Sequence, residues 1–220
     1  MPLLDWASVQ SVPRTIKLDP RRPGHLLFSP VSAIESLRVL PPAVLEPTLL
    51  MRRSVASLPS NFGGEHLDVL LRLPAPPKPG TCVGMQLLGG AANATITVVN
   101  ASSAHMELGG HVAPLPLLSS SALDAEVDDA EGGGMLELRI LVDSSIVEAF
   151  ADGGLATITH RAYSMAPAPQ RGAIALINCG DLDVQIDGVE VFQMAKATPP
   201  TMQELRARAM ANVDDLDRRK

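Results

Sequence analysis

The stretch from Met135 to Tyr163, MLELRILVDSSIVEAFADGGLATITHRAY, decides the fold class. Apolar residues at positions 136, 138, 140 and 142 alternate with polar ones, broken only by Leu141, and this period of two predicts a strand with one face on a core. Asp143-Ser144-Ser145 then interrupts the apolar run with short polar side chains that favour a turn. Residues 146–150 and 155–161 are predicted as two further strands.

Asp152-Gly153 lies between these last two strands and indicates a β-hairpin, because glycine accepts the positive φ of a type I′ turn. If these two residues form the loop, Phe150 faces Leu155 and Glu148 faces Thr157. One face of the hairpin then carries small apolar residues suited to a dry core, namely Val147, Ala149, Ala156 and Ile158. The other face is mixed and carries Ile146, Glu148, Phe150, Leu155, Thr157 and Thr159.

Glu148 is the one carboxylate on this mixed face. A carboxylate among apolar neighbours is either an acid with a tuned pKa or a structural group that is solvated or paired, and we expect the structural role.

Two stretches carry a family resemblance. Residues 139–163, RILVDSSIVEAFADGGLATITHRAY, resemble the hairpin of the C-terminal β-sandwich of glycoside hydrolase family 32, the acid invertases and fructan-active enzymes. Residues 6–14, WASVQSVPR, followed by Pro30-Val31 and by IESLR at 34–38, resemble the end of that family's five-bladed β-propeller and its connector. Both matches keep the family's order and bracket most of the chain.

The resemblance implies an all-β fold, a two-sheet antiparallel β-sandwich of the concanavalin or lectin-like jelly-roll type. Residues 1–40 are expected to be a remnant of the last propeller blade and its connector, residues 41–197 the sandwich, and residues 198–220 a charged tail or short helix. We expect the first 30 or so residues to pack against the sandwich or to be poorly ordered, because an isolated blade has unpaired edges.

The alternation of short apolar runs with turns from residue 49 to 192 fits such a sandwich. Expected strands lie at 25–28, 67–73, 82–88, 94–99, 104–108, 173–177 and 184–194. Residues 114–118 hold two prolines and are expected to form an edge strand at best.

Composition narrows the possible partners. The chain has 220 residues, 46% of them hydrophobic, which is enough for a core, and a formal charge of −6 with acids and bases interspersed. Nucleic acid is therefore not expected as a partner, and no apolar run approaches the length of a membrane span. The first residues do not show the pattern of a signal peptide, so the localisation of the chain is left open, whereas the resemblance implies a vacuolar or extracellular parent.

Retaining fructoside hydrolysis needs a carboxylate nucleophile and a carboxylic acid close together. In the family these groups lie in the propeller motifs Asn-Asp-Pro-Asn, Arg-Asp-Pro and Glu-Cys, and none of these motifs occurs in this chain. We therefore assign no catalytic residue and no substrate-binding residue. The residues singled out have structural roles and are Asp143, Ser144, Val147, Glu148, Ala149, Phe150, Asp152, Gly153 and Ile158.

Other sites are only weakly indicated. The five histidines show no metal-ligand spacing, so no metal and no cofactor are expected. Cys82 and Cys179 either form a disulfide or remain free thiols. Asn93 and Asn100 begin Asn-x-Ser/Thr sequons and are candidate N-glycosylation sites.

The function expected from the resemblance is that of the sandwich portion of a β-fructofuranosidase (invertase)-like enzyme acting on sucrose or fructans. The chain alone is expected to be non-catalytic and accessory, with the propeller domain of the parent enzyme as its partner. Two alternatives stay open, a stand-alone carbohydrate-binding module of the lectin type and a fragment from a truncated gene model. Trp6 and Tyr163 are the only Trp and Tyr, which argues against a platform for sugar stacking.

Overall fold

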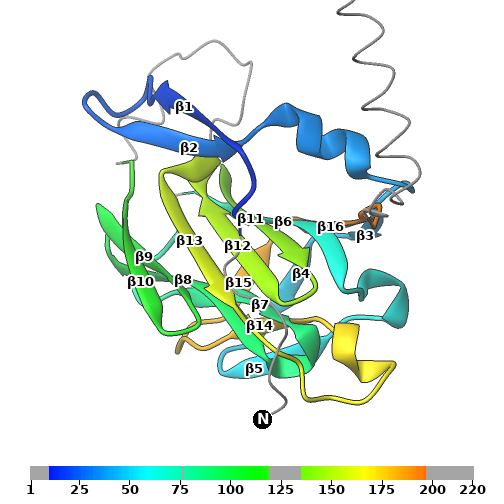
Figure 1. Cartoon of the computed structure of the whole chain (residues 1–220). Coiled ribbons are helices and arrows are strands. Elements are labelled where there is room, and N and C mark those ends of the chain that lie inside the picture. Colours follow the sequence, from blue (N-terminus) through cyan, green and yellow to red (C-terminus); the bar gives the residue numbers. More distant parts are fainter. Residues whose placement is uncertain (1–9, 76, 119–134, 197–220) are drawn as a thin grey trace, which may run out of the picture.

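The computed structural model describes residues 10–75, 77–118 and 135–196 and shows two six-stranded antiparallel sheets packed face to face (Figure 1). One sheet has the order β10-β9-β8-β7-β14-β5 and the other, called the outer sheet below, has the order β13-β12-β11-β6-β16-β3. Two strand pairs, β1-β2 and β15-β4, complete the fold. The prediction of an antiparallel β-sandwich is confirmed.

Runs of consecutive strands stay in one sheet, β7 to β10 in the first and β11 to β13 in the outer sheet, and the chain crosses between the sheets at the ends of these runs. Their bounds are β1 Arg14–Leu18, β2 Leu26–Pro30, β3 Ala43–Leu45, β4 Thr48–Leu50, β5 Ser54–Ser57, β6 His66–Pro74, β7 Cys82–Leu87, β8 Ala92–Asn100, β9 Ser103–Leu108, β10 His111–Pro116, β11 Met135–Asp143, β12 Ile146–Ala151, β13 Ala156–Arg161, β14 Ala175–Asn178, β15 Val184–Ile186 and β16 Gly188–Gln193.

Short 3-10 helices join several of these strands. They are η1 Ser32–Leu37, η2 Ser60–Phe62, η3 Leu88–Gly90, η4 Asp152–Gly154 and η5 Gln170–Gly172. Each predicted strand corresponds to a strand of the structure, and β10 is the edge strand that its prolines predicted. The predicted C-terminal tail or helix at 198–220 lies outside the described residues.

Strand register explains which side chains reach the core. One rung of the outer sheet runs Val191-Val69-Ile140-Ala149-Ile158 across five strands, and all five side chains are buried in the hydrophobic core. Because side chains alternate between faces, the next rung, Phe192-Asp68-Leu141-Glu148-Thr159, points to the opposite face. The period of two therefore fills the core with one rung and places two carboxylates on the outer face with the other.

The predicted two-residue hairpin loop is wrong. Ala151 pairs with Ala156, so the loop has four residues, and Leu155 lies in the loop rather than opposite Phe150. Three consecutive loop residues, Asp152, Gly153 and Gly154, have positive φ, at 47°, 70° and 92°, whereas a two-residue type I′ turn has only two. The register shifts by two positions, which leaves each strand residue on the face that was predicted.

The turn at Asp143-Ser144-Ser145 is confirmed. Ser144 has a φ of 54° and its amide donates to the carbonyl of Glu65, at 2.7 Å. The Asp143 carboxylate accepts from His66 Nδ1 at 2.9 Å. The chain therefore reverses at this corner with its backbone tied to a neighbouring loop.

Edge strands β10 and β13 approach each other on one side of the sandwich, where the rings of His111 and His160 lie 5.6 Å apart between centroids. Burial lowers the pKa of His160, and the charge of His111 lowers it further. The folded state therefore binds a proton less readily than the unfolded state, so its stability is greatest above the ordinary histidine pKa and falls as the pH drops through and below that value.

We expect His160→Gln to reduce the loss of thermal stability between about pH 7.5 and about pH 5, because it removes the group that must be protonated against its surroundings. The measurement is the unfolding temperature against pH, with the exposed residue changed in His25→Gln as the control. An unchanged pH dependence in His160→Gln would contradict this account.

Candidate functional site

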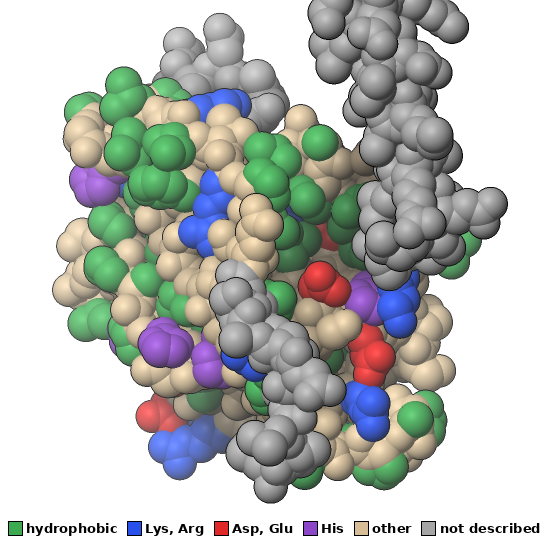
Figure 2. Space-filling view, viewed as in Figure 1, with side chains coloured by type: hydrophobic (Ala, Val, Ile, Leu, Met, Phe, Trp, Pro, Cys, Tyr) green, Lys and Arg blue, Asp and Glu red, His purple; other side chains and the backbone are tan. Residues whose placement is uncertain are grey.

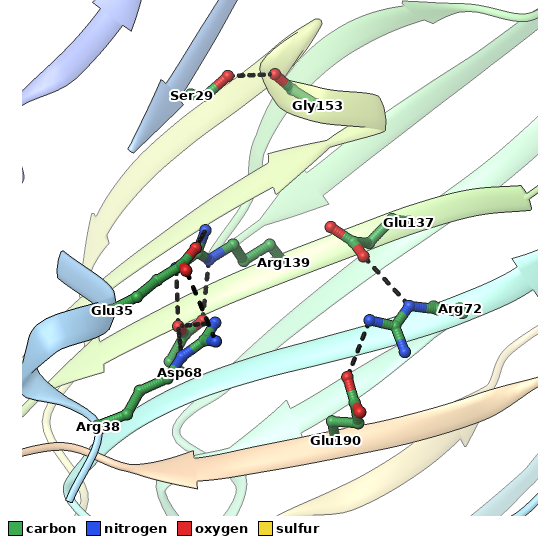
Figure 3. A network of polar contacts seen from close by, with 9 residues as sticks. All are labelled: Ser29, Glu35, Arg38, Asp68, Arg72, Glu137, Arg139, Gly153 and Glu190. Atoms are coloured by element: carbon green, nitrogen blue, oxygen red, sulfur yellow. Dashed lines mark hydrogen bonds and ion pairs between the residues drawn. The ribbon is translucent and has the colours of Figure 1, made fainter. Parts of the chain in front are cut away.

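Residues 10–40 lie across the outer face of the outer sheet, where arginines of this segment meet carboxylates of the sandwich. We call this set the polar seam, and it consists of Arg14 with Glu148, Arg21 and Arg22 with Asp152, and Arg38 with Asp68. Figure 1 shows β1, β2 and η1 above this sheet, and Figure 3 shows the Asp68 part of the seam in close-up.

Glu148 of β12 accepts hydrogen bonds from Val12 and Arg14, near the start of the described residues. Its Oε2 accepts from Arg14 Nη2 at 2.8 Å and from Thr159 Oγ1 at 3.0 Å, while its Oε1 accepts from the amide of Val12 at 2.7 Å. The Arg14 guanidinium also lies over the ring of Phe150, 5.2 Å from its centroid. Glu148 is thus the paired structural carboxylate that the sequence favoured, although its partner was not foreseen.

Asp152 anchors the turn between β1 and β2. Arg21 Nη2 donates to its Oδ1 at 2.8 Å, and Arg22 Nη2 donates to its Oδ2. Arg22 also donates from Nη1 to Asp19 Oδ2 at 2.7 Å, so this arginine bridges the two carboxylates inside the protein. Burial raises the pKa of Asp19, but hydrogen bonds from the Arg22 side chain and the Arg21 amide, with the charges of both arginines, outweigh burial and lower it overall.

Two backbone contacts fix the same corner. Ser29 of β2 donates from Oγ to the carbonyl oxygen of Gly153 at 2.7 Å, a contact drawn in Figure 3. A Cβ added to Gly154 would lie 2.4 Å from the carbonyl oxygen of Phe28, so β2 packs directly on this glycine. The Asp-Gly-Gly loop is therefore shaped to receive the N-terminal hairpin, and its positive φ values explain why glycine occupies two of its positions.

Asp68 of β6 is the most enclosed member of the seam, with none of its surface exposed. Its carboxylate accepts four hydrogen bonds of 2.7–3.0 Å, two from Arg38 and two from Arg139 of β11. Arg139 in turn reaches Glu35 of η1 at 3.3 Å. The Arg38 guanidinium lies 3.8 Å from the centroid of the Phe192 ring, so the chain just after η1 is held both by charge and by an aromatic face.

Burial alone would lower the pKa of Arg139. The hydrogen bonds and charge of Asp68, with the charges of Glu35 and Glu137, outweigh burial and raise that pKa above its usual value. Arg139 therefore stays charged. Asp68 pairs with Arg139 from its own sheet and with Arg38 from the end of η1.

A second ladder lies farther along the outer sheet, where Arg72 of β6 joins Glu137 of β11 at 3.3 Å and Glu190 of β16 at 2.8 Å (Figure 3). These side chains are about one-third exposed, so each pair contributes little to stability. The side chains of this ladder are thus more exposed than the carboxylates of the polar seam.

The sequence predicted where some of these residues lie but not what they touch. Val147, Ala149 and Ile158 lie in the core, as proposed, and Asp152 and Gly153 lie at the turn. Asp68, Arg38 and Arg139 were missed, and the available signal was a carboxylate inside the otherwise apolar strand from Leu67 to Leu73. Asn93 and Asn100 are both exposed on β8.

Cys82 and Cys179 form a disulfide, which decides between the two alternatives left open by the sequence. Their Cα atoms lie 5.0 Å apart, and the amide of Cys179 donates to the carbonyl of Cys82 at 2.9 Å. The bond ties the start of β7 to the end of β14, across the central strands of one sheet.

Within the part of the chain that the structure describes, no group of three or more His, Cys, Asp or Glu side chains is placed to hold a metal ion. No helix among these residues is both long and apolar enough to cross a membrane. A surface hollow of about 340 Å³ lies beside β4 and β15, and the residues that line it carry no aromatic ring.

The ion pairs of the polar seam hold the charged side chains of both segments in fixed positions. In the polar seam each sandwich carboxylate is neutralised by at least one arginine and is enclosed by the N-terminal segment. The described residues thus form an all-β sandwich whose outer sheet is joined by ion pairs to arginines of residues 14–38.

Comparison with known proteins gives the family. Residues 63–193 match the family model described as glycosyl hydrolases family 32 C terminal, and the chain belongs to this family as its C-terminal β-sandwich. It is 34% identical over 197 residues to an acid beta-fructofuranosidase of Solanum lycopersicum, covering 72% of this chain and 30% of that protein. It is 26% identical over 232 residues to a 6(G)-fructosyltransferase of Asparagus officinalis, covering 86% of this chain and 36% of that protein.

Solved structures agree on the fold. Fructan 1-exohydrolase IIa from Cichorium intybus superposes with a TM-score of 0.63 at 19% identity, covering 86% of this chain and 41% of that one. An exo-inulinase from Aspergillus awamori superposes with a TM-score of 0.57 at 18% identity, covering 89% and 38%. The chain thus spans about a third of the length of these curated relatives.

Proposed function

We propose that this chain is the accessory β-sandwich of a β-fructofuranosidase-like enzyme that acts on sucrose or fructans, and that it carries no catalytic group of its own. In this proposal residues 1–40 are a remnant of the last propeller blade with its connector, residues 41–197 the sandwich and residues 198–220 a charged tail or short helix. The module holds and stabilises the propeller, which supplies the nucleophile and the acid.

The polar seam is the observation that carries the proposal. Three carboxylates of the sandwich pair with arginines from residues 14–38, and two of these arginines, Arg14 and Arg38, lie in the stretches that resemble the propeller end and connector. The Asp68 carboxylate is fully buried and accepts four hydrogen bonds from Arg38 and Arg139, so it is not free to contact a substrate. The chemistry on this face therefore suits attachment rather than hydrolysis.

The surface of the attached segment supports the same reading. Ile16 and Leu18 of β1 and Leu26 of β2 are exposed, at 61%, 72% and 44%. Figure 2 shows hydrophobic side chains gathered on the upper part of the molecule, where β1 and β2 lie in Figure 1. Within the described residues β1 pairs only with β2, so its other edge is open to a further strand. We infer that the propeller covers this apolar strip.

The first test is enzymatic. We expect the purified chain to release no more glucose from sucrose than a buffer blank does. We also expect it to release no more fructose from fructans than the blank. Turnover that scales with the concentration of the chain would contradict the proposal.

The second test concerns the partner. We expect the chain to co-purify with a co-expressed propeller portion of the Solanum lycopersicum relative, and Leu18→Asp to reduce the recovered complex at least about tenfold, because a charge replaces apolar contact area. Val112→Asp on β10 is the matched control, because Val112 is also exposed, at 62%, and lies on the edge strand of the other sheet. Failure to co-purify, or equal losses in both variants, would overturn the assignment of this strip.

A further inference from the structure

The sequon at Asn100 occupies the tip of the β8–β9 hairpin. Asn100 is the last residue of β8 and pairs with Ser103, the first residue of β9, so Ala101 and Ser102 form the connecting turn. Asn100, Ala101 and Ser102 are all exposed. The whole acceptor triplet Asn-Ala-Ser therefore projects from the body of the sandwich at a tight turn.

The side chain of Asn100 is held by its own sequon. Its Oδ1 accepts from the amide of Ser102 at 2.9 Å and from the hydroxyl of Ser102 at 3.0 Å. Both hydrogen bonds engage the carboxamide oxygen, and within the described residues Nδ2 makes no hydrogen bond. The turn thus brings the serine hydroxyl onto the carboxamide and leaves the nitrogen, the atom that receives a sugar, facing solvent.

The second sequon has a different geometry. Asn93 lies inside β8, opposite Gln86 of β7, and the hydroxyl residue of its triplet, Thr95, is only 8% exposed. The three residues are extended in the strand, and among the described residues no hydrogen bond joins Thr95 to the Asn93 carboxamide, unlike Ser102 and Asn100. Local geometry therefore favours Asn100 as the acceptor.

The Cys82–Cys179 disulfide points to the compartment in which such a modification occurs. The bond joins residues 97 positions apart and belongs to the same sheet as the sequon hairpin. Disulfides form and persist in oxidising compartments such as the lumen of the endoplasmic reticulum, where N-glycosylation also takes place. This observation is independent of the side-chain geometry at Asn100.

We propose that Asn100 is an N-glycosylation site of this chain and that Asn93 is not. The donor class is a lipid-pyrophosphate-linked oligosaccharide. Nδ2 of Asn100 forms a bond to C1 of the first sugar, the bond between C1 and the pyrophosphate oxygen breaks, and the lipid pyrophosphate leaves with that electron pair. Nδ2 loses one proton to a base of the transferase, and no oxidant or reductant is needed. The glycan extends from the hairpin tip, which lies on the sheet opposite the polar seam.

The test is expression of the full chain behind a cleavable secretion leader in insect cells, with secreted and retained fractions both analysed. We expect a mass increase of one oligosaccharide that a peptide-N-glycosidase removes, leaving Asp at position 100 in the peptide map. Asn100→Gln and Ser102→Ala abolish the increase, whereas Asn93→Gln keeps it. Ser103→Ala is the matched control, since it changes the neighbouring serine and leaves the triplet intact.

Absence of a glycosidase-sensitive mass in both fractions would overturn the proposal, as would a mass increase that survives Asn100→Gln. The proposal does not depend on the accessory role of the module, because the readout is covalent modification and involves neither a propeller nor sucrose.

Discussion

Replacing Asp68 by alanine is expected to lower the free energy of unfolding by about 3–5 kcal/mol. Asp68 is fully buried and accepts four hydrogen bonds from Arg38 and Arg139. Its removal leaves two guanidinium groups, both largely enclosed, without their shared counter-charge. The measurement is urea unfolding at neutral pH, analysed by linear extrapolation.

Asp181→Ala is the control for this prediction. Asp181 also pairs with an arginine, Arg53, at 2.6 Å, but both side chains are about three-quarters exposed, so its loss is expected to cost less than about 1 kcal/mol. Asp68→Asn separates charge from size, because it keeps the shape of the side chain and removes the charge. A cost below about 1 kcal/mol for Asp68→Ala would show that the connector is not held by this carboxylate.

Removing the disulfide by changing both Cys82 and Cys179 to alanine is expected to cost about 4–5 kcal/mol. The two residues are 97 positions apart, so the cross-link restricts nearly half of the unfolded chain, and the chain-entropy relation for a loop of about 100 residues gives this magnitude. The measurement is again urea unfolding, compared with the wild-type chain under oxidising conditions.

Reduction of the wild-type chain provides the matched comparison. With dithiothreitol present, its unfolding curve is expected to shift to that of the double alanine variant, because both lack the cross-link. Superimposable curves for the wild-type chain and the variant under oxidising conditions would contradict the prediction.

The polar seam also suggests how the family's two parts act on each other. Residues 10–40 are fixed to the sandwich by ion pairs at three separate points, beginning at Arg14 and ending at Arg38. In the proposed enzyme these residues are the end of the propeller and the connector, so we expect the ion pairs of the seam to join the sandwich to the last blade.

Local chemistry made several features predictable from the sequence. The alternation from Leu136 to Val142 assigned a strand and its faces, and Val147, Ala149 and Ile158 lie in the core as that pattern required. Proline placed β10 at an edge, because proline lacks the amide hydrogen that an interior strand must donate. The family resemblance came from residues 139–163 together with residues 6–14, 30–31 and 34–38.

The hairpin loop shows where local reasoning stops. Asp-Gly favours a two-residue turn, but Asp152 leaves the strand ladder because Arg21 and Arg22 hold its carboxylate and β2 packs on Gly154. Those partners lie about 130 positions away in the sequence, so no local rule could include them.

The sequence by itself determined the sandwich, the core face of each central strand, and the absence from this chain of the family's carboxylate motifs. Only the tertiary structure decided that Asp68, Glu148 and Asp152 are each neutralised by arginines of the N-terminal segment, and that Cys82 bonds to Cys179. The physical reason is separation along the sequence. Strand faces follow from the alternation of neighbouring residues, whereas an ion pair or a disulfide forms only where packing brings distant segments together.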